Sequence, residues 1–495
     1  MPMNWKPKAQ LSDQEVKKSL RMVLFDGLTA EALVCLSSGA VLVAIALSLG
    51  ASNFEIGLLA AFPTLTNLAQ ILTILVLRKF PYRKLFTIIA VFISRLPLIL
   101  IGIIMWFGES QTVSLLLYGI FVHYLFSALG GAGWNSWVKD LVPEQNLGSY
   151  FSKRSRYMQM VNISLSVVVA ILIDYVQENF AEYLHLLYAS YLTLAGLFGI
   201  IGTILLSRAY DPKIFMSGDN IFSVLSEPLR NVNFRRLLWF NGMWSFSINL
   251  AIPFFTVFML QNLGLSMVFV IMLSVITQLF SVLTIRNWGN LSDRYSNKSI
   301  IFLAAPIYVL CLLGWIFVGI YSKHFLNIGL LILLHVVTGI STSGINLALT
   351  NIGLKLAPKQ DAVIYISVKN IMTSIFSAMG PIIGGVLADF FVNNDLKVTF
   401  EWVSPGYYKE LKLIYLHDWN FLFLIASLLS ILSLQLLAKV EESGEVSHYL
   451  VRKVLRSRLR QRLKDNIIVG NIGHVHAQIK AIVKRKGGQT SPPFT

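Results

Sequence analysis

The chain has 495 residues, of which 55% are hydrophobic and only 13% are charged. Soluble domains are usually about 45–50% apolar and about 25% charged, so this composition excludes an ordinary soluble enzyme. A mean hydropathy of +0.66 over this length cannot be hidden in one water-soluble core, because cores stop growing near about 250–300 residues. The sequence therefore predicts an integral membrane protein, all-α, whose apolar surface meets lipid.

Twelve apolar runs are each long enough for a transmembrane helix, which needs about 20 such residues. The runs cover 27–49, 55–77, 85–107, 113–138, 157–176, 184–207, 237–260, 266–285, 299–321, 327–350, 363–390 and 419–438. They divide the chain into a segment 1–26, six helices within 27–207, a linker 208–236, six helices within 237–438, and a tail 439–495. The polar segment Met1–Lys18 carries no cleavable signal, so the first run is expected to remain as an anchor.

Basic residues mark the orientation of these helices. Of the 41 Lys and Arg residues, 35 lie in the two terminal segments and the even-numbered connections. By the positive-inside rule, both termini then lie in the cytoplasm, and we expect a multi-pass protein of a bacterial inner (plasma) membrane. The net charge of +16 is explained by this orientation, so no nucleic-acid partner is implied.

An internal repeat relates the two sets of six helices. Phe25-Asp26-Gly27 matches Phe240-Asn241-Gly242 at a spacing of 215, and Arg154 and Asp174 match Lys369 and Asp389 at the same spacing. The alternative is that two hydrophobic bundles share a few Gly and Pro residues by chance. Several matches at one spacing favour two bundles in the same orientation, an arrangement typical of transporters that rock two bundles about a central site.

Polar side chains are spread unevenly over the twelve runs. The third, sixth, ninth and twelfth runs have almost none in their middles, so we expect these four helices to face lipid and the other eight to surround a polar cavity. For any single residue the alternative is a hydrogen bond between packed helices. The candidates for lining the cavity are Gln70, Asn162, Asn241, Asn249, Gln278, Asn346 and Asn370.

One connection carries a family signature. The segment from Gly289 to Lys298 reads GNLSDRYSNK and resembles the G-x-L-[SA]-D-R-x-G-R-[RK] loop of the major facilitator superfamily (MFS). The resemblance implies two pseudo-symmetric six-helix bundles and a gate at this loop. The first-half loop 78–84 has neither the Gly nor the Asp of the signature. The gate candidates are Gly289, Asp293, Arg294, Asp140, Arg154 and Lys369.

A few ionisable groups within the runs are candidates for proton coupling. Glu31 lies about five residues inside the first run, where an ionised carboxylate is costly, and it is the leading candidate to load and release a proton. The alternative is an ion pair between Glu31 and Arg95, or hydrated headgroup space around Glu31. Arg95, near the middle of the third run, is itself a candidate for proton coupling, and its expected structural role is a pair with an acid such as Glu31. His123 and His335 titrate near neutral pH in their ordinary state and are candidates to bind substrate or protons, or else to pack as hydrogen-bonding residues.

The tail from 451 to 464 alternates apolar residues every four positions with Arg and Lys, as expected of a helix lying on anionic lipid. A solvated or partner-binding helix is the alternative.

The sequence lacks the features of an enzyme. There is no phosphate-binding Gly-Lys-Ser/Thr loop, and Cys35 and Cys311 are the only cysteines, so we expect no catalytic residue, cofactor or metal. The sequence instead predicts a secondary active transporter for a small polar or amphipathic solute, with possible coupling to protons. Two alternatives remain open: a drug or amphiphile exporter, and a non-transporting sensor or assembly protein. Gly380, Pro381, Gly384 and Gly385 resemble the G-P-x-x-G-G motif that proton-driven drug exporters of the family carry on span five. Here the motif lies on span eleven, where it indicates tight helix packing, and its absence from span five disfavours an antiporter.

Overall fold

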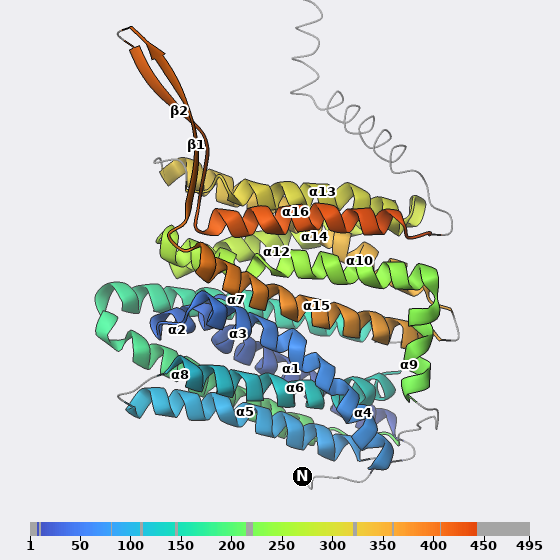
Figure 1. The fold of residues 1–495 in the computed structure, drawn as a ribbon. Helices are drawn as coiled ribbons and strands as arrows, with labels where there is room; N and C mark the ends of the chain where they lie inside the picture. Colours follow the sequence, from blue (N-terminus) through green and yellow to red (C-terminus); the bar gives the residue numbers. More distant parts are fainter. Residues whose placement is uncertain are drawn as a thin grey trace, which may run out of the picture.

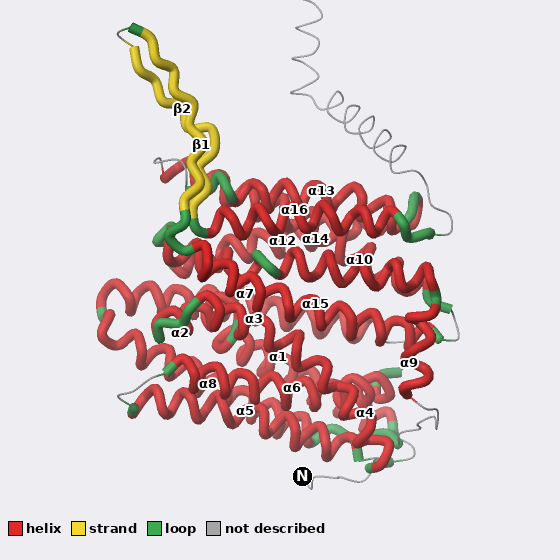
Figure 2. The backbone as a smooth tube through the Cα atoms, in the orientation of Figure 1, coloured by secondary structure: helices red, strands yellow, loops and turns green. Residues whose placement is uncertain are grey.

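The structure of the chain is a computed structural model that describes residues 7–8, 11–80, 82–108, 112–143, 147–213, 221–319, 324–358, 361–405 and 407–442. Within these ranges, twelve helices are long and apolar enough to cross a membrane. The predicted all-α membrane fold with twelve spans is therefore confirmed, and Figures 1 and 2 show its helices running side by side. The tail predicted to lie on the membrane falls outside the described residues.

The first half contains six spans, some of them built from two helices. Its helices are α1 (Asp13–Ser37), α2 (Gly39–Ser48), α3 (Asn53–Thr66), α4 (Gln70–Lys79), α5 (Arg83–Phe107), α6 (Val113–Leu141), α7 (Leu147–Asn179) and α8 (Leu184–Ser207). The first span begins well before the predicted residue 27, because the Ser12 hydroxyl accepts the Glu15 N–H and the Glu15 carboxylate accepts the Ser12 N–H. Part of the predicted amino-terminal segment is thus helix α1.

The second half repeats this pattern after a linker that contains the short helix α9 (Ile221–Arg230). Its other elements are α10 (Val232–Asn249), α11 (Ile252–Val257), a π-helical turn (Phe258–Asn262), α12 (Met267–Arg294), α13 (Asn297–Trp315), α14 (His324–Leu356), α15 (Ala362–Phe391), β1 (Asp395–Ser404), β2 (Tyr407–His417) and α16 (Trp419–Ala438). The last span coincides with the predicted run.

The four helices predicted to face lipid lie on the two outer flanks. Figure 1 shows α5 and α8 on one flank and α13 and α16 on the other, while α3, α7, α12 and α15 lie between them. The outward face of α5 carries large exposed apolar side chains at helical spacing: Leu85, Ile89, Phe92, Leu96, Leu100, Ile103 and Phe107. The four helices thus occupy outer positions, but α7 and α12 also carry exposed apolar side chains such as Ile171 and Leu283, so which helices face lipid stays a prediction.

The two halves approach each other most closely where α3 meets α15. A Cβ added at Gly57 would collide with the carbonyl oxygen of Pro381, and one added at Gly385 would lie 2.6 Å from that of Asn53. Only glycine permits such backbone contact. The segment from Gly380 to Gly385, which resembles an exporter motif, therefore serves close helix packing in this structure.

An antiparallel hairpin of β1 and β2 projects from one end of the bundle (Figure 2, yellow). We call this end the hairpin side and the opposite end, where α1 begins and α16 ends, the termini side. The sequence analysis assigned no structure to this connection, although a Pro-Gly pair between two β-prone runs is a turn signal. At its base, the Asn393 N–H donates to the Asp418 carboxylate at 2.8 Å, and both residues have positive φ.

The hydrophobic core is shared on the hairpin side and divided on the termini side. The largest cluster joins residues of both halves, including Leu42 and Ile45 with Phe254 and Phe258. Toward the termini side, one cluster contains only first-half residues and another only second-half residues. The halves are thus held together at one end and packed separately at the other.

Candidate functional site

A polar cavity of about 430 Å³ lies between the two halves. Helix α7 contributes most of its wall, α1 contributes one residue, and α12 of the second half contributes one. The lining residues are Glu31, Phe151, Arg154, Ser155, Met158, Gln159, Asn162 and Gln278. The structure therefore brings together four residues predicted from the sequence: Glu31, Arg154, Asn162 and Gln278.

Glu31 is held in this cavity by α7. Its Oε1 accepts a hydrogen bond of 2.7 Å from Nδ2 of Asn162. Among the described residues, Glu31 has no ion-pair partner, so the predicted pair with Arg95 is not formed. The Asn162 amide fixes the position of the carboxylate without neutralising its charge.

Arg154 reaches from α7 to the backbone of α1. A Cβ added at Gly27 would lie 2.7 Å from Nη2 of Arg154, so the glycine makes room for the guanidinium. The guanidinium carbon lies 4.9 Å from the ring centre of Trp134, a cation–π contact. Its buried Nε has no hydrogen-bond acceptor among the described residues. Arg154 is thus placed precisely while retaining unused donor capacity.

Arg95 lies next to a carboxylate that the sequence analysis assigned to the amino-terminal segment. Asp26 on α1 interacts electrostatically with Arg95 on α5 and with Arg154 on α7. Two glycines of α8 make room for this group, since a Cβ at Gly199 would lie 2.5 Å from Cδ of Arg95 and one at Gly202 would lie 3.2 Å from Oδ1 of Asp26. The repeat match of Asp26 with Asn241, which lies in the seventh apolar run, was a signal that could have placed Asp26 on a helix.

A second polar cavity, of about 370 Å³, lies where α3 and α4 meet α15. Two predicted residues, Gln70 and Asn370, line it from opposite halves. Gln70 donates to the side chain of Asn67 at 3.0 Å, within the break between α3 and α4. Among the side chains that line this cavity none is charged, which distinguishes it from the cavity at Glu31.

Three other asparagines predicted to line a cavity do not meet in either one. Asn241 is buried and its Nδ2 has no partner among the described residues, Asn249 donates to the Ser245 carbonyl at 2.8 Å, and Asn346 is exposed. The helical spacing predicts the face of the helix on which each asparagine lies. The tilt of the helix decides which neighbouring residues that face contacts.

The two predicted histidines are hydrogen-bonded to backbone carbonyls. His123 is buried, and its Nδ1 lies 2.7 Å from the Ser94 oxygen. His335 Nδ1 lies 2.9 Å from the oxygen of Leu331 on its own helix, and its ring packs edge-on against Trp315. In this structure both histidines are packed hydrogen-bonding residues, which was the alternative to binding substrate or protons. Among the described residues, no group of His, Cys, Asp or Glu is placed to hold a metal ion.

Two carboxylates join the halves on the hairpin side, and we call them the hairpin-side latches. Asp174 at the end of α7 accepts the N–H groups of Met267 and Val268 at 2.7 and 2.8 Å, at the start of α12. Asp389 near the end of α15 accepts those of Asn53 and Phe54 at 3.1 and 2.9 Å, at the start of α3. The repeat had paired the two aspartates without revealing this role.

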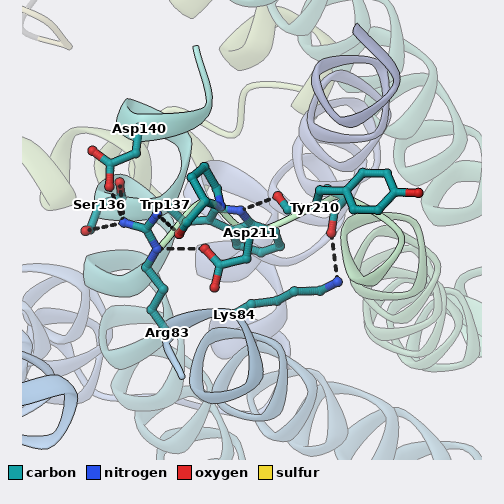
Figure 3. Close-up of polar contacts among 9 residues, drawn as sticks. Arg83, Lys84, Ser136, Trp137, Asp140, Tyr210 and Asp211 are labelled. Carbon is teal, nitrogen blue, oxygen red and sulfur yellow. Dashed lines mark hydrogen bonds and ion pairs between the residues drawn. The ribbon is translucent and has the colours of Figure 1, made fainter. Parts of the chain in front are cut away.

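On the termini side, the first half has a buried cluster around Arg83 (Figure 3). The Arg83 side chain is fully buried, and its guanidinium contacts Asp140 at 2.5 Å and Asp211 at 2.8 Å. Lys84 donates to the Ala209 carbonyl at 2.7 Å. Burial raises the pKa of Asp211, and the nearby Arg83 and Lys84 only partly oppose it. The predicted gate residue Asp140 thus ties α6 to α5 within one half.

The second half has a corresponding cluster around Glu442. Its carboxylate accepts the N–H groups of Asn297 and Lys298 at 3.2 and 2.8 Å and the Lys355 ammonium at 2.9 Å. Burial by itself raises the pKa of Glu442, but these hydrogen bonds outweigh it and leave the pKa lowered. The predicted gate residue Lys369 lies apart from the cluster and donates to the Leu349 carbonyl at 3.0 Å.

The predicted gate loop shows contacts within its own half. Asp293 lines a pocket of about 470 Å³ together with Asn297 and Lys355, all from the second half. Arg294 is exposed and lies over the ring of Tyr295. The ideal Cβ of Gly289 would lie 3.8 Å from Leu347 of α14. Among the described residues, these contacts of the loop all lie within the second half.

Comparison with known proteins agrees with this architecture. The family model described as Major Facilitator Superfamily matches residues 28–360 and 245–472. Among curated protein sequences, none matches the chain. The nucleoside transporter NupG is 13% identical, with a TM-score of 0.63 over 86% of this chain and 98% of that one.

Two further solved structures share the fold. The inward-open xylose transporter XylE from E. coli is 12% identical, with a TM-score of 0.58 over 89% of this chain and 99% of that one. A bacterial homologue of the iron transporter ferroportin, in an inward-facing state, is 14% identical, with a TM-score of 0.57 over 87% and 99%. The family model matches more than half of the sequence, so the chain belongs to the Major Facilitator Superfamily and is a transporter.

Proposed function

We propose that the protein is a secondary active transporter that moves a small polar or amphipathic solute by alternating access. The observation that carries this proposal is the difference between the two ends of the interface. The hairpin side has a shared core and two latches, whereas the termini side has separate cores and a polar cavity. Breaking the latches while the termini side closes would expose the cavity to the other face of the membrane.

The termini side is assigned to the cytoplasm in this proposal, because most of the basic residues of the chain lie at that end. The structure would then represent the state closed toward the outside. The basic tail beyond residue 442 is proposed to contact anionic lipid of the inner leaflet.

Proton coupling is proposed to involve Asp26 rather than Glu31 alone. Asp26 is the carboxylate that interacts with two arginines from other helices, Arg95 and Arg154. Protonation of Asp26 would leave both cations without their shared counter-charge, which changes the relative stability of arrangements of α1, α5 and α7. A protonation step that alters helix packing is what coupling to a conformational change requires.

The test uses the full chain reconstituted in liposomes that contain a pH-sensitive dye, challenged with pooled metabolites and amphiphiles. Wild-type protein is expected to give a solute-evoked pH change. Asp26→Asn is expected to abolish that change while leaving solute exchange across the membrane measurable, because the carrier still rocks without a proton. Exposed Glu178 supplies the matched control, Glu178→Gln, which removes a carboxylate far from the cavity.

The outcomes separate the parts of the proposal. A pH change that persists unaltered in Asp26→Asn would exclude Asp26 as the coupling group. If it is lost in Glu31→Gln and kept in Asp26→Asn, the coupling role moves to Glu31. Absence of exchange for every pool would contradict transport of small metabolites or amphiphiles by this chain.

A further inference from the structure

The cavity at Glu31 carries two opposite charges that do not neutralise each other. Of its eight lining residues, Glu31 and Arg154 are the only two with a formal charge. No ion pair joins them, since Glu31 is bonded to Asn162 and Arg154 packs against Gly27 and Trp134. A cavity with one cation and one anion held apart is the feature from which the inference starts.

The spacing of the two charges follows from the helix that both meet. The Arg154 guanidinium lies against Gly27, and Glu31 is four residues further along α1. Residues four apart lie on the same face of an α-helix, separated by one turn, about 6 Å along the axis. The carboxylate and the guanidinium therefore line one wall of the cavity at neighbouring turns of α1.

Both charged groups retain capacity to bind. The buried Nε of Arg154 has no acceptor among the described residues. Asp26 attracts Arg154 electrostatically from the side of α8, but no hydrogen bond between the two is formed among the described residues. Glu31 receives one neutral N–H donor and no cation. A ligand that supplies a cation at Glu31 and a hydrogen-bonding carboxylate at the Arg154 guanidinium therefore gains at both ends, since Asp26 attracts Arg154 without a hydrogen bond to it.

We propose that this cavity binds a small zwitterion of amino-acid size, with its ammonium at Glu31 and its carboxylate at Arg154. A volume of about 430 Å³ lies toward the lower end of the range for small-molecule sites, about 300–1,000 Å³, which excludes bulky solutes. A guanidinium can hold a carboxylate by two parallel hydrogen bonds. The inference rests on the proposed transport function, since it names the class of solute carried.

Gln278 is the group that makes such binding sensitive to the conformation of the carrier. It reaches the cavity from α12 of the second half, whereas every other lining residue comes from the first half. Movement of the halves apart removes this side chain from the ligand. A zwitterion bound by the first half therefore gains or loses one polar contact as the carrier rocks.

The test measures ligand-induced thermal stabilisation of the full-length protein in detergent, using three matched forms of each common amino acid. The free amino acid is a zwitterion, its N-acetyl derivative is an anion, and its carboxamide is a cation. At least one free amino acid is expected to raise the unfolding temperature, and its two derivatives are expected to bind about tenfold or more weakly, because each leaves one charge in the cavity unpaired.

Two variants make the test specific to the charge pair. In Glu31→Gln, the free amino acid is expected to bind no more tightly than its N-acetyl derivative, which lacks the ammonium. In Arg154→Gln, the free amino acid is expected to bind no more tightly than its carboxamide, which lacks the carboxylate. A variant that had lost its fold would lose binding of all three forms, so it could not lose one preference and keep the other. Arg154→Lys should retain the wild-type order, and Glu178→Gln should leave every shift unchanged.

The inference is overturned if no free amino acid stabilises the protein, or if the two variants keep the wild-type order of the three forms. Solute exchange in liposomes distinguishes this failure from failure of the proposed function. Exchange of uncharged solutes without binding of amino acids leaves transport standing and removes the zwitterion site. Selective binding of amino acids without any solute exchange would support the zwitterion site and contradict the proposed transport function.

Discussion

The two ends of the molecule use the internal repeat in different ways. On the hairpin side, Asp174 and Asp389 are the same residue at equivalent positions, and each accepts two N–H groups at the start of a helix in the opposite half. On the termini side one equivalent position carries a reversed charge, since Asp140 corresponds to Lys355 at the repeat spacing of 215. Arg83 lies between two aspartates in the first half, and Glu442 accepts from Lys355 and two backbone N–H groups in the second.

This difference follows from what each set of contacts joins. The latches connect the halves to each other, and each uses the positive end of a helix dipole, for which a carboxylate is the suitable partner. Each cluster lies within its own half, where any arrangement that gives every charge a partner can hold three helices together. The Arg83 cation at the start of α5 opposes the helix dipole and is surrounded by two carboxylates. The Glu442 carboxylate, which follows α16, accepts N–H groups at the start of α13, where the dipole favours a negative charge.

The largest effect is expected from removing Arg83. Arg83→Ala removes the cation that contacts both Asp140 and the buried Asp211, and such a loss costs about 3–5 kcal/mol of unfolding free energy. Thermal or denaturant unfolding in detergent measures it. Arg294→Ala, at an exposed arginine, is the control and should change stability little. An Arg83→Ala protein as stable as this control would show that the cluster contributes nothing to folding.

The latches are expected to come next, with an effect on conformation and not on the folding of either half. Asp174→Ala and Asp389→Ala each remove two charge-assisted hydrogen bonds, worth about 1–2 kcal/mol in the hairpin-side closed state. Spin labels at exposed Tyr183 and Val392, one in each half, report the separation of the halves. Each variant should shift the distance distribution toward longer values, and the double variant further.

The matched control for the latches is Asp395→Ala, on the same side but at the base of the hairpin, where Asp395 pairs with Lys397 of its own strand. Distances that stay unchanged in the double latch variant would contradict the latch role.

A smaller effect is expected at Glu442. Glu442→Gln keeps one acceptor oxygen for the N–H groups of α13, removes the charge and replaces the second acceptor by an NH2 donor. Lys355, which is 40% exposed at its side chain, can then turn to solvent. The expected loss is about 1 kcal/mol, because breaking a partly exposed pair leaves no buried unpaired cation. An equal or larger loss than in Arg83→Ala would reverse the comparison between the two clusters.

The smallest effect concerns the pH dependence of stability. The pKa of Glu442 is lowered from 4.5, so its contribution is complete above pH 4.5 and is lost as the pH falls through the lowered value. The pKa of Asp211 is raised from 3.8, so ionising it costs stability as the pH rises through the raised value. Unfolding as a function of pH should therefore change slope in opposite directions in Glu442→Gln and Asp211→Asn.

The sequence predicted the fold because the bilayer imposes length and polarity on every span. The apolar runs, the repeat and the polar pattern sufficed for twelve helices, two bundles and the four helices on the outer flanks. The cavity could be predicted only in part. Glu31, Asn162 and Gln278 were recognised as polar residues on cavity helices, but their contacts depend on helix tilt and rotation, which no spacing reveals.

Residues near the helix ends were the hardest to predict. Asp26 lies just before the first apolar run and Arg83 at the edge of the third, where hydropathy does not separate a loop from the buried end of a helix. Their roles depend on glycines and carboxylates of other helices, such as Gly202 and Asp211. Long-range pairing of this kind leaves no periodic signal in one sequence.

The hairpin has a consequence for observing this transporter at work. Both of its strands join the ends of α15 and α16, and its base is fixed by Asn393 and Asp418, so it must follow the second half as a rigid pointer. Ten residues of strand extend about 30 Å, and a rotation of roughly 10° would therefore sweep its tip by roughly 5 Å. A fluorophore or a gold particle attached at the tip would magnify the rocking of the carrier into a displacement that single-molecule optics or electron microscopy can follow.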